Sequence, residues 1–279
     1  YGELNFEKKR YKIITLENSF HGRTITTVKA TGQSSFHQSK FAPYPDGFSF
    51  NAIDDVYNAI DDETVAVMIE LVQGEGGVFP FDKEKIKELA KFLKENDILL
   101  IIDEVQTGVF RTGEFLASNL YEIEPDIITL AKGIGGGVPM GAVMTKHKDI
   151  WTAGDHGSTF GGNYLVTAAA LEVLDILENL KDSGTLDETI IYFTKKLNDI
   201  FEANRDIFIT HVGLGLMRGL RVKDADTLAS LIKTAFECGV MVLKSGNNTL
   251  RFLPALTISK SEIDEGFIRL QKAITKIKS

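Results

Sequence analysis

The sequence predicts an α/β fold with a mostly parallel central sheet and helices on both faces, followed by a smaller C-terminal α+β domain. Up to about residue 178, short apolar runs alternate with segments of helical periodicity, which is typical of parallel strands joined by crossover helices. The chain has 279 residues, of which 43% are hydrophobic and 25% are charged. It can therefore bury a large core.

Five apolar runs are the predicted strands of the sheet. They cover residues 12–16, 66–71, 98–102, 127–130 and 142–145. Between the second and the third, Asp82 is the predicted N-cap of a helix, because Ile86 and Leu89 begin an apolar stripe with the helical period. We expect the lysines and glutamates of this helix to form a solvated face.

A long helix beginning near Tyr164 is predicted to lead out of the large domain, which we place at residues 1–178. Its predicted buried side carries Ala168, Leu171, Leu174, Ile176 and Leu177. The small domain, residues 179–279, is predicted to contain helices at 186–201, 226–238 and 260–277 and strands within 208–222, 240–243 and 250–252. Because the chain lacks an initiator methionine and enters its first strand almost at once, we expect the N-terminal part of the large domain to be missing.

The formal net charge of −8 disfavours nucleic acid as a partner, because a phosphate backbone requires clustered lysines and arginines. No stretch approaches the roughly 18 consecutive apolar residues of a membrane span, and no signal-like segment is present. The single cysteine, Cys238, is predicted to be a small core residue and suits a reducing compartment, so we expect a cytoplasmic protein. His37, His147 and His211 lack metal-ligand spacing, and no metal site is predicted.

Lys132 and Asp103 occupy positions that indicate chemistry. Lys132 lies where a predicted strand meets the glycine-rich segment 133–141, and a lysine buried there is biased toward the neutral amine that condenses with a carbonyl. Asp103 follows the run 98–102, one strand-helix-strand unit of about 30 residues before Lys132. Both strand ends should therefore meet at one edge of a parallel sheet. An amine that can form a Schiff base and a carboxylate that can keep the pyridine nitrogen protonated are the two groups that a pyridoxal-phosphate site needs at the least.

Each of these residues also has a purely structural interpretation. Lys132 could be an exposed loop lysine, and Asp103 could be no more than a helix cap. Glu104 is predicted to be structural. The glycines of 133–141 do not match a dinucleotide-binding motif, because their spacing is wrong and no acidic residue follows at the expected distance. We expect them to let the backbone pass close to the lysine.

Six segments together resemble the motifs of the class III aminotransferases, which are fold-type I pyridoxal-phosphate enzymes. They are residues 20–24, 69–77, 103–108 with 111–113, 130–133, 156–162 and 251–254. They follow the family's order, and the similarity extends over nearly the whole chain. The resemblance implies an aminotransferase with pyridoxal 5'-phosphate as its cofactor, which takes a small amino acid and 2-oxoglutarate in a ping-pong cycle.

The resemblance also implies the cofactor-binding residues. Lys132 corresponds to the Schiff-base lysine, which moves the proton between substrate and cofactor, and Asp103 to the carboxylate that keeps the pyridine nitrogen protonated. Phe20 would stack on the ring, and Gln106 would form a hydrogen bond near its phenolic oxygen. The remaining candidates on this side are Val105 and His21. For His21 a packing role is an equal alternative.

Ser158 and Thr159 are the candidate phosphate ligands. Their hydroxyl and backbone groups could donate to a phosphate at a helix start, and in the family this segment reaches the cofactor of the neighbouring subunit. The resemblance therefore implies a homodimer with shared active sites, in which Ser158 also contacts substrate. The alternative is that 157–162 is a plain flexible loop.

Arg251 and Arg23 are the candidate ligands of substrate carboxylates, because a guanidinium binds a carboxylate through two parallel hydrogen bonds. The family pattern assigns the α-carboxylate to Arg251 and the side-chain carboxylate to Arg23. Glu75, paired with Arg251, would mask its charge when the substrate presents a side-chain amine and release it when 2-oxoglutarate binds.

By resemblance, the amino donor would be N2-acetylornithine, which gives N-acetylglutamate 5-semialdehyde and glutamate in arginine biosynthesis. Other class III donors, namely ornithine, succinyl-diaminopimelate and 4-aminobutyrate, are alternatives. A non-catalytic scaffold derived from the same fold is an alternative of another class. The presence of Lys132, Asp103 and Gln106 together argues against it, because a non-catalytic sheet has no use for that combination.

Overall fold

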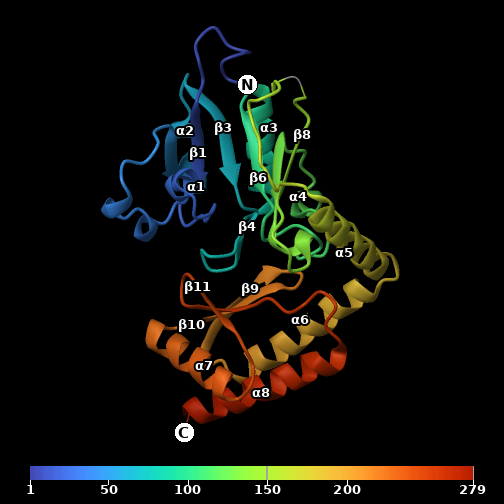
Figure 1. The fold of residues 1–279 in the computed structure, drawn as a ribbon. Helices are drawn as coiled ribbons and strands as arrows, with labels where there is room; N and C mark the ends of the chain where they lie inside the picture. Colours follow the sequence, from blue (N-terminus) through green and yellow to red (C-terminus); the bar gives the residue numbers. More distant parts are fainter. Residues whose placement is uncertain (149, 279) are drawn as a thin grey trace. The chain divides into compact units, whose positions relative to one another are not determined.

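The structure, a computed structural model, describes residues 1–148 and 150–278, and the chain forms two compact units (Figure 1). Unit 1 consists of Tyr1–Leu71, Phe81–Gly108 and Leu116–Val173. Unit 2 consists of Val72–Pro80, Val109–Phe115 and Leu174–Ser279, of which all but the last residue is described. Unit 2 therefore takes two short segments from the first half of the chain in addition to the C-terminal part.

Unit 1 contains a six-stranded sheet in the order β2-β1-β3-β6-β7-β8. Its strands are β1 (Lys12–Leu16), β2 (Phe48–Asn51), β3 (Thr64–Ile69), β6 (Leu99–Asp103), β7 (Ile127–Leu130) and β8 (Ala142–Thr145). All neighbours pair in parallel except β7 and β8. The predicted α/β class with a mostly parallel sheet is confirmed, and the sequence analysis missed only β2, a short edge strand that is half exposed.

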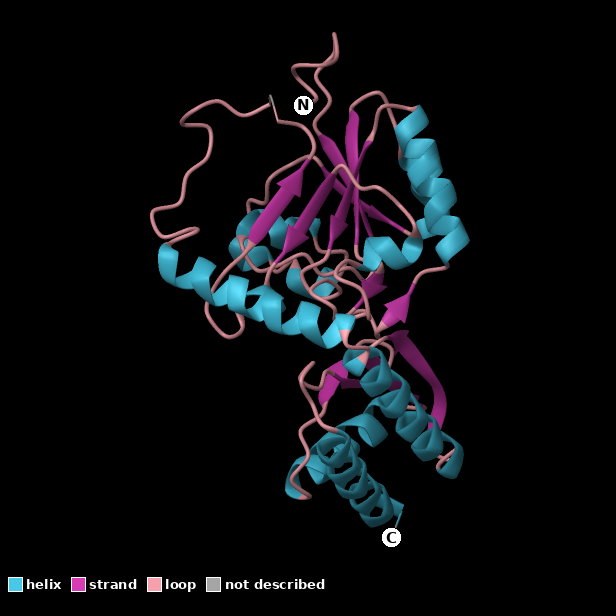
Figure 2. Cartoon of the chain, turned by 90° about the vertical axis from the view of Figure 1, so that its right-hand side faces the viewer, coloured by secondary structure: helices cyan, strands magenta, loops and turns pink. Residues whose placement is uncertain are grey.

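Helices flank this sheet, as Figure 2 shows. They are α1 (Ile25–Ala30), α2 (Val56–Ala59), α3 (Lys83–Glu95), α4 (Ala117–Tyr121) and the first part of α5 (Tyr164–Asp182), with short 3₁₀ turns at Ser34–Phe36, Ser39–Phe41, Ile53–Asp55 and Lys132–Gly135. The predicted cap of α3 is confirmed, because Asp82 Oδ1 accepts a hydrogen bond from the Lys85 N–H at 2.9 Å. Ile86, Leu89 and Leu93 are the buried residues of this helix.

The prediction for the buried face of α5 is partly wrong. Leu177 is buried as expected, but Ala168, Leu171 and Ile176 are exposed. The buried residues are Val166, Ala170 and Leu177. Both stripes of this apolar helix follow the helical period, so periodicity alone does not decide which of them faces the protein.

Unit 2 contains an antiparallel sheet in the order β11-β12-β10-β9, packed against three helices. The strands are β9 (Phe208–Leu214), β10 (Met217–Val222), β11 (Leu243–Ser245) and β12 (Thr249–Phe252), and the helices are α6 (Thr185–Ala203), α7 (Ala225–Glu237) and α8 (Lys260–Lys278). A two-stranded ribbon, β4 (Val72–Gln73) with β5 (Phe79–Pro80), completes the unit. The rings of Phe193, Phe252 and Phe267 pack together between sheet and helices.

The predicted strand at 240–243 begins three residues too early. The Val240 N–H donates to Ala235 O at 3.0 Å, and Gly239 adopts a positive φ of 82°, so both residues belong to the C-terminal cap of α7. The strand begins at Leu243. Cys238 lies in the same cap and is half-buried. None of the described helices combines the length and the apolar character that crossing a membrane requires.

Candidate active site

Asp103 and Lys132 lie at the same edge of the sheet of unit 1. Asp103 is the last residue of β6 and pairs in register with Thr129 of the parallel strand β7. Lys132 begins a 3₁₀ turn two residues after β7 ends. Because parallel strands place their carboxyl ends at one edge, where open α/β sheets bind ligands, this edge is the candidate active site.

Three hydrogen bonds hold the Asp103 carboxylate, which is only 5% exposed. Oδ2 lies 2.8 Å from His21 Nδ1, and Oδ1 accepts from the Val105 N–H and from Thr129 Oγ1, each at 3.1 Å. An ionised carboxylate only accepts, so His21 Nδ1 is the donor of this pair whenever Asp103 is ionised. The orientation of the carboxylate is therefore fixed from the ends of three different segments.

His21 links the first strand of the sheet to this carboxylate. Its side chain is buried, and its backbone N–H donates to Thr31 Oγ1 at 3.0 Å. The other ring nitrogen, Nε2, is also buried and has no hydrogen-bond partner within the described part of the chain. A buried polar atom without a partner costs free energy, which is typical of a site prepared for a ligand or for function.

Glu104, predicted to be structural, is confirmed in that role. Its carboxylate is 1% exposed and accepts hydrogen bonds from the Ala117 N–H at 3.0 Å and from the Ser118 N–H at 2.8 Å. Thr107 Oγ1 also donates to it. Because the first N–H groups of a helix lack partners within the helix, Glu104 serves as the cap of α4.

The expected burial of Lys132 is wrong for the chain alone. Lys132 is exposed, as are Gly136 and Gly137 of the loop that follows it. A single turn at the sheet edge, followed by glycines without side chains, provides little cover for the amine. The Lys132 backbone is unusual in another respect, because its φ of 48° lies in the left-handed region, where a residue with a Cβ pays about 1 kcal/mol. Such conformations cluster at functional sites.

Phe20 lies at the same edge, and its N–H donates to Glu70 Oε1 at 2.8 Å. Its ring meets that of Phe36 edge to face, with 5.3 Å between the centroids. The guanidinium of Arg23, an exposed residue, stands 5.0 Å from the Phe36 ring centroid and 5.6 Å from that of Phe20. This cation–π contact keeps Arg23 next to the aromatic residue that is predicted to cover the cofactor.

The remaining predicted ligands of unit 1 lie in loops. Val105 and Gln106 are half-buried in the turn that follows β6. Ser158 and Thr159 are exposed and precede α5, whose predicted start is confirmed, because Asn163 Oδ1 caps this helix by accepting from the Leu165 and Val166 N–H groups. Ser158 Oγ accepts from the Gly161 N–H within a turn.

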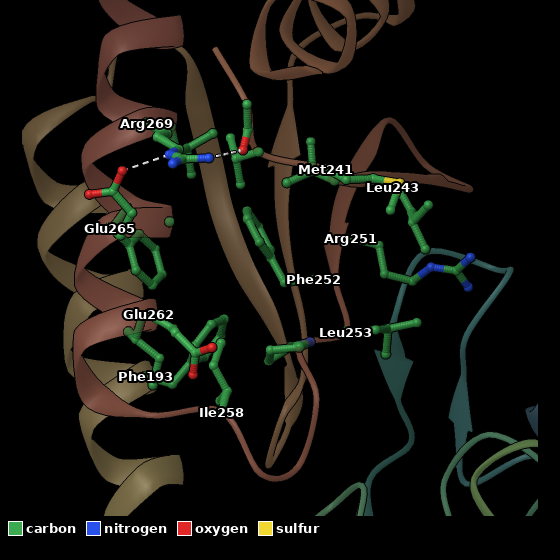
Figure 3. A pocket seen from close by; sticks show the side chains of 18 of the residues that line it. Phe193, Met241, Leu243, Arg251, Phe252, Leu253, Ile258, Glu262, Glu265 and Arg269 are labelled. Atoms are coloured by element: carbon green, nitrogen blue, oxygen red, sulfur yellow. Dashed lines mark hydrogen bonds and ion pairs between the residues drawn. The ribbon is translucent and has the colours of Figure 1, made fainter. Parts of the chain in front are cut away.

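Arg251 and Glu75, which lie in unit 2, form the predicted pair. Arg251 Nη1 donates to Glu75 Oε1 at 2.8 Å and to Gly74 O at 3.0 Å. Arg251 is only 7% exposed. In Figure 3 its side chain points away from Phe252 and α8, toward the teal segment that contains β4 and β5. A buried arginine that is paired with the carboxylate of a side chain can exchange that carboxylate for one of a ligand.

A second arginine secures the segment after Arg251. Arg111 Nη1 donates to Pro254 O at 2.6 Å and to Leu216 O at 3.2 Å. Burial lowers the pKa of Arg111 to about 10, so it remains charged at neutral pH. Because both acceptors are backbone carbonyls, Arg111 stabilises unit 2 by linking the backbone at Leu216 to the backbone at Pro254.

Two residues that position the site were not predicted from the sequence. Thr129 supports Asp103, and Glu70 anchors the backbone of Phe20. The sequence offered two signals, namely the hydroxyl of Thr129 inside the apolar run 127–130 and the carboxylate of Glu70 directly after β3. Neither could be given a role before the strand register was known. Among the described residues no group of three potential ligands could hold a metal ion.

Comparisons with known proteins agree with this geometry. The family model "Aminotransferase class-III" matches residues 1–274. The acetylornithine aminotransferase of Wolinella succinogenes is 57% identical over 97% of this chain and 69% of its own length. The enzyme of the same name from Caldanaerobacter subterraneus subsp. tengcongensis is 41% identical over 100% of this chain and 71% of its own length.

A solved structure is similar along the whole chain. The ornithine aminotransferase from Toxoplasma gondii, in a crystal structure described as having partial occupancy of PLP at the active site, superposes with a TM-score of 0.89 at 30% identity. The match covers 100% of this chain and 68% of that one.

Proposed function

Given that the chain belongs to the class III aminotransferase family, we propose that it transfers the side-chain amino group of N2-acetylornithine to 2-oxoglutarate. The products are N-acetylglutamate 5-semialdehyde and glutamate, in arginine biosynthesis. The enzyme uses pyridoxal 5'-phosphate as its cofactor. The proposal is carried by the shared sheet edge of Asp103 and Lys132 in a chain that is 57% identical to a named acetylornithine aminotransferase.

The residues at the edge fit this cofactor. A buried carboxylate is favourable only when cationic or hydrogen-bonding partners compensate its desolvation, and the three bonds to Asp103 leave its oxygens with further acceptor capacity. Asp103 would hold the protonated pyridine nitrogen, and Phe20 would cover the ring. The cofactor, when bound, supplies an electron sink for the negative charge that develops on the substrate carbon.

Lys132 is the proposed catalytic base and acid. Its Nζ would bind the cofactor before the substrate arrives and would then carry the proton from one carbon to another. Because Lys132 is exposed in the single chain, burial within this chain does not provide the neutral amine. The surroundings of the assembled site have to provide it. Val105 and Gln106 complete the proposed contacts on the Asp103 side.

The proposed substrate contacts are Arg251, Arg23, Glu75 and Ser158. While Glu75 holds Arg251, as the structure has it, the arginine is neutralised and a donor presents its side-chain amine. When 2-oxoglutarate enters, its α-carboxylate replaces Glu75 on Arg251 with two parallel hydrogen bonds. Arg23 would bind the second carboxylate. We call the Glu75–Arg251 pair the carboxylate gate.

We also propose a cytoplasmic homodimer with shared active sites. Phe160, Tyr164 and Leu165 are 80%, 95% and 73% exposed, and together they form an apolar surface around the start of α5. Large exposed apolar side chains in sequence proximity mark an interface, and a second copy of the chain would cover them. The adjoining Ser158 and Thr159 would then reach the partner's cofactor phosphate. The single cysteine is consistent with a reducing compartment.

A donor screen tests the proposed reaction. The complete protein, reconstituted with pyridoxal phosphate, is mixed with 2-oxoglutarate and with N2-acetylornithine, ornithine, succinyl-diaminopimelate or 4-aminobutyrate, and glutamate formation is measured. We expect the highest kcat/KM with N2-acetylornithine and a kcat at least about a hundredfold lower in the Lys132→Ala variant. A strong preference for 4-aminobutyrate would overturn the assignment of the donor.

A further inference from the structure

The loop that carries Glu75 is held by the β11–β12 hairpin through three consecutive carbonyl groups. The hydrogen bonds run from Ser245 Oγ to Gly74 O (2.7 Å), from the Gly246 N–H to Glu75 O (2.8 Å) and from Asn247 Nδ2 to Gly76 O (2.8 Å). Loop and hairpin both belong to unit 2. The backbone on both sides of Glu75 is therefore fixed independently of the ion pair made by its carboxylate.

The two backbones approach so closely that only glycine fits at the contact. A Cβ at Gly246 would lie 2.9 Å from Glu75 O and 3.0 Å from the carbonyl carbon of Gly76. On the other side, a Cβ at Gly77 would lie 3.0 Å from Gly246 O. Contacts of this kind cannot be relieved by rotating a side chain, because the opposing atoms are backbone.

The β11–β12 hairpin has its own ordered backbone structure. Ser245 and Thr249 pair across it, and the Thr249 N–H donates to Gly246 O at 3.2 Å. Asn247 and Asn248 both adopt a positive φ of 51°, a conformation that asparagine tolerates better than most residues. Of the two, only Asn247 directs its amide to the loop, whereas no hydrogen bond or ion pair involves the Asn248 side chain in the described chain.

We propose that Ser245 and Asn247 are positioning residues of the carboxylate gate, and that they select donors whose reacting amine is remote from a carboxylate over α-amino acids. The inference rests on the proposed function of the Glu75–Arg251 pair. On a fixed backbone, Glu75 leaves Arg251 only by rotation of its side chain. A loosened backbone exposes the arginine for a larger fraction of the time, and Arg251 then accepts the α-carboxylate of glutamate as a donor more readily.

The test compares two half-reactions in one preparation. The complete protein is loaded with pyridoxal phosphate, and conversion of the cofactor to its amino form is followed by absorbance with N2-acetylornithine or with L-glutamate. The ratio of the two kcat/KM values measures how strongly the carboxylate gate favours N2-acetylornithine over glutamate as the donor. Asn247→Gly removes the amide donor and keeps the left-handed backbone, while Asn248→Gly makes the same change at the next residue and serves as the matched control.

We expect Asn247→Gly to lower the acetylornithine-to-glutamate ratio by about three- to tenfold, the effect of losing one hydrogen bond. The change should come mainly from a lower KM for glutamate and for 2-oxoglutarate, and Asn248→Gly should stay within twofold of the parent. Ser245→Ala should shift the ratio in the same direction but less, because Arg251 still donates to Gly74 O. This second variant decides the matter if Asn247→Gly fails to fold.

The outcomes separate this inference from the proposed function. If the parent protein does not react with N2-acetylornithine at all, the proposed donor is wrong whatever the variants do. If the parent reacts and Asn247→Gly and Ser245→Ala both keep its ratio within twofold, the gate is not set by the hairpin. An equal loss of both rates with an unchanged ratio would likewise overturn the inference, because it would show a merely structural role.

Discussion

The cap of α4 by Glu104 allows a quantitative prediction. Glu104→Ala leaves two buried N–H groups, those of Ala117 and Ser118, without their acceptor and removes the partner of the Thr107 hydroxyl. An unsatisfied buried donor costs about 1–3 kcal/mol, so we expect a loss of about 3–5 kcal/mol in the free energy of unfolding. For a domain of this size that corresponds to a fall in Tm of roughly 10 °C.

The isosteric change Glu104→Gln should cost less. Its carbonyl oxygen can still accept from one of the two helix N–H groups, while its NH₂ group would face the other donor. We therefore expect a loss of about 1–2 kcal/mol. Glu124→Ala is the matched control, because Glu124 is an exposed carboxylate in the same unit. Its effect should lie within about 0.5 kcal/mol of the parent.

The assay is thermal and urea unfolding of the complete protein with bound cofactor, together with kcat measured well below the Tm. We expect the largest loss of stability in Glu104→Ala, a smaller loss in Glu104→Gln and the smallest in the control Glu124→Ala. The reasoning fails if Glu104→Ala is as stable as the control. It fails equally if the variant retains its stability but loses catalysis, since Glu104 would then belong to the reaction and not to the cap.

Three further predictions address the reaction, the pH dependence and the assembly. Lys132→Ala should lower kcat by at least about a hundredfold, measured as glutamate formation, and retention of activity would exclude it as the base. Desolvation, followed by the charges of Arg218 and Arg205, lowers the pKa of His211 in the folded state. The unfolded chain then binds the proton more readily, so the free energy of unfolding falls as the pH drops below about 6.5. In urea unfolding, the difference in this free energy between pH 7.5 and pH 5.5 should be smaller for His211→Asn than for the parent protein. Leu165→Asp places a charge on the exposed apolar surface of α5 and should convert the proposed dimer to a monomer in sedimentation, whereas a variant that stays dimeric would locate the interface elsewhere.

Much of the sheet was predictable because its strands are short apolar runs between polar segments. Three predicted strands coincide with β1, β7 and β8. The strand β2, with the sequence Phe-Ser-Phe-Asn, was missed because four residues hold only two apolar positions, which is too short an alternation to distinguish a strand from a loop. The buried face of α5 could not be chosen, since the apolar surface of this helix extends beyond the stripe that packs against the chain.

The sequence was sufficient to predict that Asp103 and Lys132 lie at one edge of the sheet, but not to predict the surroundings of these two residues. The spacing of Asp103 and Lys132 follows from the topology of parallel strands, which the sequence shows. The exposure of Lys132 depends on what surrounds a one-turn helix, which no local pattern encodes. The bond between His21 and Asp103 joins residues far apart in the sequence, so its geometry had to come from the folded chain.

The alignment of Thr129 with Asp103 restricts how the length of this chain can change during evolution. Side chains alternate along a strand, so inserting or deleting one residue within β7 would turn the Thr129 hydroxyl to the opposite face and move Lys132 off the edge. Residues 122–125 carry no such constraint from the pairing, whereas Asp126 already exchanges hydrogen bonds with Leu100 of β6. Insertions and deletions among homologous enzymes should therefore accumulate before Asp126 and be almost absent from Asp126 to Lys132.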